Sequence, residues 1–298
     1  MSRNNSDGER QLKNILYNSD VKKCKVDFIF NKKASETVFN IERNTRGITI
    51  KNECIKINHH LSGTKYEFSS LLKKDNDLKG CFEPALNVRT RNNINTEKGT
   101  MTDALQILAT KISMSMPNYE KGSIEISDAA AIDDINITPF RLLRRHDGLY
   151  EKYGYSSDAL IEFKTFLKTL TWGKLISVKE IYEMVSYFAA KFDVLHPSLT
   201  NVDPDTLATD VFRRISFEDE KKTLDNKYDA SLSFNVYSKI KEHFFNFTED
   251  DDPNVLYLGE DSKEWKKMSK ALSIVSVEEM PVIKRNNKTR KNRKRTIG

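Results

Sequence analysis

The stretch that decides the fold is residues 123–155, SIEISDAAAIDDINITPFRLLRRHDGLYEKYGY. Apolar and polar residues alternate over Ser123–Asp128, which predicts a strand. Pro139 fits the first turn of a helix, where the backbone N–H has no partner within the helix and is not missed. The aromatic elbow Tyr150–Tyr155 closes the stretch, and Gly154, which has no Cβ, can end the helix in a left-handed conformation. The predicted order is therefore strand, polar turn, helix and elbow.

Further strands are predicted upstream of this stretch. Four segments alternate apolar and polar residues between Asn-, Lys- or Gly-containing turns, namely Lys25–Phe30, Thr37–Ile41, Gly47–Ile57 and Thr64–Leu72. This pattern favours an antiparallel meander, and another strand is expected within Cys81–Val88. Thr102–Ile112 predicts a helix, since its apolar residues share one face. We expect the strands near Leu86 and Ile124 to run parallel and splay apart, with this helix packed on their sheet.

The chain after residue 156 has helical periodicity. Four amphipathic segments are separated by short polar connections, namely Ser156–Thr171, Ser177–Phe192, Asp203–Ile215 and Ser231–Phe245. The first is expected to begin at Ser157 and to stop at Gly173. A strand-like run at Val255–Leu258 and a helix at Glu264–Leu272 follow. The sequence thus predicts a polar segment with a short helix (1–20), an α/β domain (21–156), a helical domain (157–280) and a basic tail (281–298).

Positive charge is concentrated at the C-terminus. The formal net charge is +6, and residues 284–295 hold eight basic residues and no acidic one, so the rest of the chain carries −2. The eight are Lys284, Arg285, Lys288, Arg290, Lys291, Arg293, Lys294 and Arg295. Such a tail is typical of disordered segments, because its charges repel and it has little to bury. Three roles fit it, which are binding nucleic acid or another polyanion, targeting, and solubility alone.

What the sequence lacks disfavours several classes of protein. It has no run of about 18 or more apolar residues, and Met1–Arg10 has no apolar signal core, so we expect no membrane span and no secretory signal. The protein is therefore expected to be intracellular, in cytoplasm or nucleus or in a particle assembled inside a cell. P-loop and nucleophile-elbow motifs are missing, which argues against NTPases and hydrolases. His59 and His60 would point to opposite faces of a strand, so no metal site is predicted.

The elbow carries a family resemblance. Tyr150-Glu151-Lys152-Tyr153-Gly154-Tyr155 resembles the closing motif of the GCN5-related N-acetyltransferase (GNAT) fold, in which a helix ends in Tyr-x-x-x-Gly-Phe/Tyr and the chain re-enters the sheet. Residues Gly122–Ala130 and Ile135–Tyr155 are similar to divergent acetyltransferase-like proteins of large DNA viruses. The resemblance covers Val26–Tyr155 and implies a GNAT-like α+β (or α/β) fold, a mostly antiparallel sheet with packed helices, here followed by an α-helical C-terminal domain. It also implies a role in a virus particle.

The resemblance implies acetyl-CoA as the cofactor. In this family a loop and the helix N-terminus after it hold the pyrophosphate, because unpaired backbone N–H groups and the helix dipole favour an anion. The family pattern is Gln/Arg-x-x-Gly-x-Gly/Ala, and this chain has Thr96-Glu97-Lys98-Gly99-Thr100-Met101. The candidate cofactor-binding residues are thus Lys98, Gly99, Thr100 and Met101. Of the pattern only Gly99 matches, and the Met101 side chain would occupy space that the phosphate oxygens need.

The resemblance also implies a catalytic residue. In this fold an amine attacks the thioester directly, a backbone N–H on a splayed strand holds the oxyanion, and a tyrosine protonates the leaving thiolate. By its place in the motif that tyrosine would be Tyr150; the alternative is that Tyr150, Tyr153 and Tyr155 are packing tyrosines with their hydroxyls at the surface. Asp128, Asp133 and Asp134 lie in a turn and do not identify a general base. Two functions remain, an acyl-CoA-dependent N-acetyltransferase and a non-catalytic descendant that binds protein partners or nucleic acid.

Overall fold

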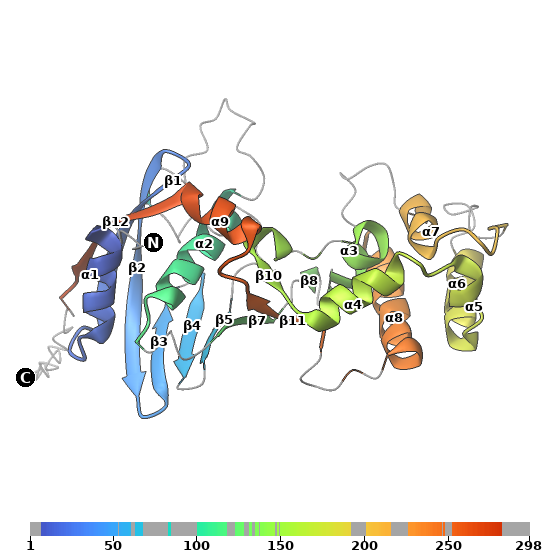
Figure 1. Cartoon of the computed structure of the whole chain (residues 1–298), viewed down its shortest axis with the longest axis horizontal. Helices are drawn as coiled ribbons and strands as arrows, with labels where there is room; N and C mark the ends of the chain where they lie inside the picture. The colour runs from blue at the N-terminus through green and yellow to red at the C-terminus, as the bar shows by residue number, and fades with distance from the viewer. Residues whose placement is uncertain are drawn as a thin grey trace, which may run out of the picture.

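The computed structural model describes residues 7–52, 54–60, 63–67, 83–84, 100–117, 123–127, 131–132, 135–136, 138–146, 148, 150–191, 201–215, 226–245, 247 and 252–281. The predicted α+β class is confirmed for these residues. One large sheet occupies one end of the molecule and a group of helices the other (Figure 1). The strand order in the sheet is β10-β11-β7-β5-β4-β3-β2-β1-β12, with β6 paired to β2 beside this path.

An antiparallel meander forms the first half of the sheet. Its strands are β1 (Lys23–Phe30), β2 (Lys33–Asn44), β3 (Gly47–Lys51), β4 (Lys56–His60) and β5 (Gly63–Glu67). Each pairs antiparallel with the next, as the alternating sequence predicts. In β1, Cys24, Val26, Phe28 and Phe30 are buried, while the intervening Lys25 forms ion pairs on the other face. One face of this half of the sheet is therefore core and the other polar, which is the usual reason for alternation in antiparallel strands.

A helical crossover joins the meander to the second half of the sheet. The chain passes from β5 through α2 (Thr100–Met114) to β7 (Ile124–Ser127), and β7 pairs parallel with β5. The predicted packing of this helix on the sheet is confirmed, since α2 contacts β4, β7 and β12. The predicted parallel partner was wrong. β6 (Glu83–Pro84) pairs antiparallel with β2, and Leu86 lies outside the described residues.

Two late segments of the chain return to the sheet. β10 (Tyr155–Ser156) pairs with β11 (Val255–Leu258), which pairs with β7, and β12 (Leu272–Glu279) pairs with β1. The segment 157–280, predicted to be a helical domain, therefore contains two strands, β11 and β12, that belong to the sheet. Local periodicity identifies a strand such as Val255–Leu258 but carries no information about a partner more than a hundred residues away.

The remaining helices lie between β10 and β11 in the sequence. They are α4 (Asp158–Leu167), α5 (Trp172–Ile176), α6 (Lys179–Lys191), α7 (Ala208–Ile215) and α8 (Asn226–Phe244). Ser157, where the first is predicted to begin, is its N-cap, but the helix ends at Leu167, before Gly173, which lies inside α5. Because Ser156 pairs with Tyr257, both ends of this segment meet, and α4–α8 form an insertion between neighbouring strands. α3 (Thr138–Arg145), from before the elbow, packs against α7 and α8.

The buried face of the sheet is covered by α1 (Asp7–Tyr17), α2 and α9 (Lys263–Met268) (Figure 1). The N-terminal helix lies within the segment 1–20 in which the sequence predicts a short helix. It lies so close to β12 that a Cβ on Gly8 would overlap the carbonyl group of Ile274. Gln11 Oε1 accepts a hydrogen bond of 2.9 Å from the backbone N–H of Val277. The edge strand is thereby shielded from pairing with another chain.

Candidate functional site

The elbow is a tight turn closed by a glycine. η3 (Glu151–Tyr153) is one turn of 3₁₀-helix, in which the N–H of Gly154 donates to the Glu151 carbonyl at 2.9 Å. Gly154 has φ +87°, so the predicted left-handed conformation is confirmed. A Cβ at this position would overlap Ser262 Oγ and lie 2.8 Å from Trp265 Cβ. Glycine is therefore required here both by the backbone conformation and by the close approach of the residues that begin α9.

The tyrosines of the elbow are packed inside the protein. Tyr150, Tyr153 and Tyr155 are between 0% and 3% exposed. The hydroxyls of Tyr155 and Thr110 lie 2.9 Å apart, and the Tyr153 hydroxyl donates to Asp103. The alternative of tyrosines with surface hydroxyls is therefore wrong for Tyr153 and Tyr155. Both hydroxyls bind polar groups of α2, which satisfies them without solvent.

The carboxylate of Asp103 lies in the first turn of α2. Its carboxylate accepts hydrogen bonds from the Tyr153 hydroxyl and from Lys152 Nζ, the latter at 2.7 Å. The ammonium of Lys152 also lies 4.7 Å from the centre of the Tyr153 ring. Burial, and then the hydrogen bond to Asp103, raise the pKa of Tyr153 far above its ordinary value, so this tyrosine stays protonated as a donor. The helix dipole favours the carboxylate at this end of α2.

Only part of the predicted cofactor loop can be placed. Lys98 and Gly99 lie outside the described residues, whereas Thr100 and Met101 form the first positions of α2. The helix starts two residues before the Thr102 predicted from its apolar face. Thr100 and Met101 therefore share the helix end with Asp103, and any anion bound there would meet the Asp103 carboxylate within the same turn.

β5 and β7 part after a short parallel contact. Their register runs over Thr64↔Ile124 and Lys65↔Glu125. Beyond it β5 stays paired with β4 as far as Glu67, and β7 stays paired with β11 as far as Ser127. The sequence predicts splaying between the strands near Leu86 and Ile124, whereas the strands that part in the structure are β5 and β7.

Tyr150, the predicted general acid, is placed at the base of the elbow. It precedes η3, and its carbonyl accepts the N–H of Tyr153 at 3.0 Å. The centres of the Tyr150 and Tyr153 rings are 6.5 Å apart. The structure therefore brings Tyr150 together with Tyr153, whose hydroxyl donates to Asp103 on α2, while its position relative to Lys98 and Gly99 is not defined by the described residues.

The sequence analysis did not identify the two α2 residues that form hydrogen bonds with the elbow tyrosines. Asp103 and Thr110 are seven positions apart, which places them on one side of the helix two turns from each other. Polar residues at this spacing within an apolar helix would have been the available signal. Their role depends on contacts with residues about fifty positions away, and such contacts have no local sequence signature.

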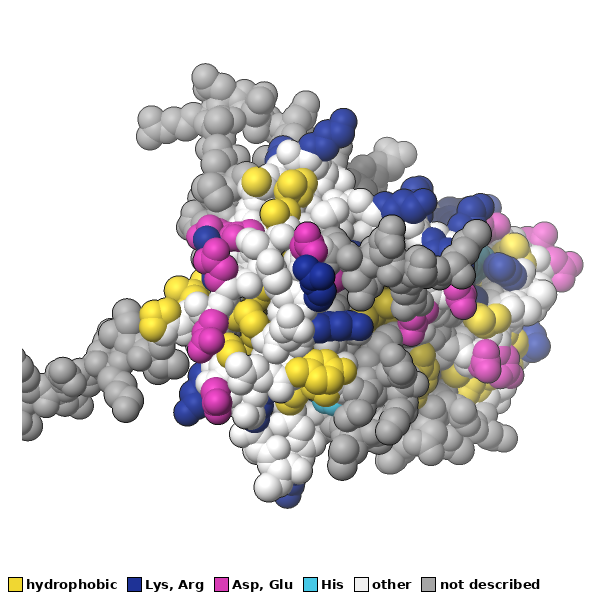
Figure 2. All heavy atoms as spheres, turned by 60° about the vertical axis from the view of Figure 1, so that its left-hand side comes forward, with side chains coloured by type: hydrophobic (Ala, Val, Ile, Leu, Met, Phe, Trp, Pro, Cys, Tyr) yellow, Lys and Arg dark blue, Asp and Glu magenta, His cyan; other side chains and the backbone are white. Residues whose placement is uncertain are grey.

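The other predicted site residues cannot be placed relative to the site. Asp128, Asp133 and Asp134 and the basic tail lie beyond the described residues. Within the part of the chain that the structure describes, no group of three His, Cys, Asp or Glu side chains is arranged to hold a metal ion, and no helix is long and apolar enough to cross a membrane. On the face shown in Figure 2, basic and acidic side chains are interspersed and form no large field of one sign.

Comparison with known proteins identifies no relative, so the function is inferred from the sequence and the geometry of the site. A scan against protein-family models and searches of curated proteins and of solved structures found no match to this chain.

Proposed function

We propose that this chain is a divergent GNAT-like protein whose acyl-CoA site has decayed and which acts as a structural or interaction component. Its descent from an acyltransferase fold is supported by three features. These are the parallel strands that part, the helix that crosses between them, and the elbow with its left-handed Gly154. Together they support the fold that the resemblance of Tyr150–Tyr155 implies.

The loss of the cofactor is supported above all by Asp103. Its carboxylate lies in the helix turn where the pyrophosphate of coenzyme A would bind, and Tyr153 and Lys152 already engage it. Two unit charges of the same sign roughly 6 Å apart repel by about 3 kcal/mol at an effective dielectric constant near 20. Lys152 offsets part of this repulsion but is itself occupied. Met101, at the second position of the same helix, adds a bulky side chain where the family pattern has a small residue.

Titration of the full chain with acetyl-CoA by calorimetry tests this proposal. We expect no saturable binding up to about 1 mM, because the helix end already holds an anion. The variant Met101→Gly/Asp103→Asn should gain measurable affinity, whereas Asp158→Asn, which changes the first-turn acid of the exposed start of α4, should not. Saturable binding by the unaltered protein, with a Kd below about 100 μM, would contradict a decayed site.

A second candidate is an acyl-CoA-dependent N-acetyltransferase with Tyr150 as general acid. The parting of β5 and β7 favours it, because unpaired backbone N–H groups on a splayed strand can hold an oxyanion. Release of thiol from acetyl-CoA in the presence of a lysine-rich peptide would distinguish the two candidates. If the enzyme function holds, Tyr150→Phe should lower the rate by about a hundredfold, the usual contribution of a general acid.

The interaction role extends to the basic tail. Residues 284–295 hold eight basic residues, whereas the rest of the chain has a net charge of −2, so we infer that polyanions such as nucleic acid bind the tail. With eight phosphates neutralised, affinity should fall about a thousandfold or more between 50 and 200 mM salt. The comparison is between the full chain and one ending at Val282, each at two salt concentrations. Equal binding by both chains would remove the tail as the site. A place inside a virus particle, beside protein partners, follows from the family resemblance alone.

A further inference from the structure

Three lysines share the outer face of the helical segment at residues 263–271. α9 continues directly into η5 (Ser269–Ala271), one turn of 3₁₀-helix, and Lys263, Lys267 and Lys270 occupy positions i, i+4 and i+7. At about 3.6 residues per turn, these positions fall within roughly 60° of one another around the helix axis. All three residues are exposed. They therefore form one basic stripe along the helix.

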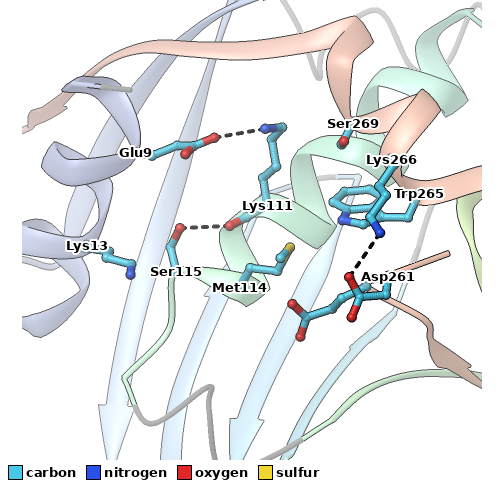
Figure 3. Close-up of a pocket in the computed structure, with 10 residues that line it drawn as sticks. Glu9, Lys13, Lys111, Met114, Ser115, Asp261, Trp265, Lys266 and Ser269 are labelled. Atoms are coloured by element: carbon cyan, nitrogen blue, oxygen red, sulfur yellow. Dashed lines mark hydrogen bonds and ion pairs between the residues drawn. The ribbon is translucent and has the colours of Figure 1, made fainter. Parts of the chain in front are cut away.

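The opposite face of this helix is anchored to the protein. Trp265 is 5% exposed and, with Met114 of α2, lines the cleft drawn in Figure 3. Its backbone N–H donates to Ser262 Oγ at 3.1 Å, which caps the helix. Two positions along an α-helix correspond to a rotation of about 200°, so Trp265 points away from Lys263. Because the indole is buried, the basic stripe is directed toward solvent.

A tight turn places two more lysines beside the stripe. Asn31 and Lys32, both with positive φ, connect β1 to β2, and Lys33 begins β2. The backbone N–H of Asn31 donates to the carbonyl of Ala271 at 2.9 Å. Lys32 and Lys270 are each one residue away from this hydrogen bond, so the turn adjoins the end of the stripe. Lys32 and Lys33 are both exposed.

These five lysines, here called the basic patch, carry charge that nearby side chains do not neutralise. They are Lys32, Lys33, Lys263, Lys267 and Lys270. Within the ranges that the structure describes, none of their side chains forms an ion pair or a hydrogen bond. Lys266 is not a member, because its Nζ lies 3.1 Å from Asp261, the contact dashed in Figure 3. The exposed Glu264 lies about 100° around the axis from Lys263 and forms no ion pair with the patch lysines.

We propose that the basic patch binds nucleic acid through its phosphate backbone. Five lysines can neutralise up to five phosphates, and contacts to phosphate need charge alone. Among the described residues, no large apolar side chain is exposed on α9, on η5 or in the turn at residues 31–33. A lipid surface is bound more strongly when apolar groups enter it, and a stable protein interface has an apolar centre, so both partners fit this patch less well. Binding is therefore independent of base sequence.

The basic patch is separate from the acyl-CoA site and from the basic tail. β12 runs from Leu272, next to η5, to Glu279, a length of about 25 Å at roughly 3.4 Å per residue. The patch therefore lies at one end of β12, and the chain leaves the sheet toward its tail at the other end. Substitutions in the patch test this inference without altering the tail.

Fluorescence anisotropy of the full chain with a labelled 20-base-pair DNA duplex tests the proposal between 50 and 200 mM salt. The triple variant Lys263→Gln/Lys267→Gln/Lys270→Gln removes the stripe. We expect its affinity at 100 mM salt to fall about tenfold or more. The slope of log K against log salt should decrease by about two to three, because each phosphate contact contributes roughly 0.9. The variant Lys263→Arg/Lys267→Arg/Lys270→Arg keeps the charge and should bind within about twofold of the unaltered chain.

A matched control removes the same charge elsewhere. Lys22→Gln/Lys168→Gln/Arg214→Gln changes three exposed residues outside the patch and should lower the affinity less than about threefold. Circular dichroism checks that all variants melt near the temperature of the unaltered chain. Equal losses in the control and the stripe variant would show that only net charge matters and would overturn the proposal.

Two further outcomes would also overturn it. Unchanged DNA binding by the stripe variant would leave the tail as the site, and no DNA binding by the unaltered chain would exclude both basic regions. Vesicles of phosphatidylserine and phosphatidylcholine provide the competing surface. Vesicle binding that is lost in the stripe variant, together with DNA binding that is retained, would assign the patch to anionic lipid instead.

Discussion

The sheet and the inserted helices are held together by contacts of different range. In the sheet, β1 pairs with β12, and Ser276 Oγ donates to Asp27 across 249 positions of sequence. In the insertion, Ser157 caps the start of α4 from three residues away, and Thr171 does the same for α5. The sheet therefore forms only when strands from near both ends of the chain pair with each other. The start of α4 and the start of α5 are each fixed by a capping residue next to the helix. Local signals are accordingly more informative for the helices than for the order of the strands.

Aromatic packing joins the inserted helices to one another. The ring of Phe163 meets that of Tyr237 at 4.9 Å between centres, and Phe166 meets Phe244 at 5.1 Å. The ammonium of Lys174 lies 5.0 Å from the centre of the Phe166 ring. Such contacts fix α4 against the end of α8 without any strand pairing. The two regions meet at β10 and β11, directly after the elbow.

The largest effect on stability is expected from Gly154→Ala, because Gly154 immediately precedes β10, where the sheet and the inserted helices join. An alanine would have to hold φ near +87° and overlap Ser262 Oγ. We expect a loss of about 3–5 kcal/mol in the free energy of unfolding, measured by urea denaturation. The control is Gly259→Ala, whose Cβ would come no closer than 3.4 Å to any atom and should cost less than about 1 kcal/mol. Similar losses for both variants would show that the elbow needs no special backbone conformation.

A smaller effect, confined to the helices, is expected from Arg144→Met. Buried Arg144 donates through Nε to the Phe212 carbonyl at 2.8 Å, and Arg213 donates through Nε to the Arg144 carbonyl at 2.5 Å. The two arginines thus hold the C-terminal ends of α3 and α7 together. Removing the first guanidinium should cost about 2–3 kcal/mol, because the Phe212 carbonyl loses a charged donor. Hydrogen exchange should accelerate in α3 and α7 and stay unchanged in β1–β4.

The matched variant for this test is Arg214→Met, on the exposed side of α7. It should change exchange by little in either region. Faster exchange throughout the sheet in Arg144→Met would mean that the helices and the sheet unfold as one unit and are not separately stabilised.

A local effect at the sheet edge is expected from Gln11→Ala. The Gln11 side chain is the acceptor for the backbone N–H of Val277 in β12. Its removal should cost about 1 kcal/mol and expose this amide to exchange with solvent. Asn14→Ala, on the exposed face of the same helix, is the control. Unchanged protection of the Val277 amide in the Gln11 variant would show that α1 shields the edge by packing alone.

The smallest effect is a dependence on pH at His146. This residue has φ +55°, and burial, followed by the charges of Arg213, Lys168 and Lys164, lowers its pKa. Asp210 acts in the opposite direction. The unfolded chain therefore takes up a proton below about pH 6.5 before the folded chain does, so stability is full above that pH and is lost as the pH falls. His146→Asn, which tolerates positive φ, should reduce the fall in melting temperature between about pH 7 and 5 by roughly 1–2 °C.

The sequence by itself determined the type of most elements and the special backbone of the elbow. Alternation in β1–β4 predicted which side chains face the core, because successive residues of a strand point to opposite faces. The absence of a Cβ predicted the left-handed Gly154, and the serine before α4 predicted its N-cap, because both properties belong to single residues. The shared apolar face of α2 predicted a helix on the sheet.

Only the tertiary structure decided which elements are neighbours. Local pattern states that a segment is a strand and which face is buried, but the partner is chosen by packing over the whole chain. This is why β5 runs beside β7 and why β12 closes the sheet against β1. For the same reason the sequence does not show that Tyr153 forms a hydrogen bond with Asp103, or Tyr155 with Thr110. Their buried hydroxyls need partners, and only the folded chain brings those partners within hydrogen-bond distance.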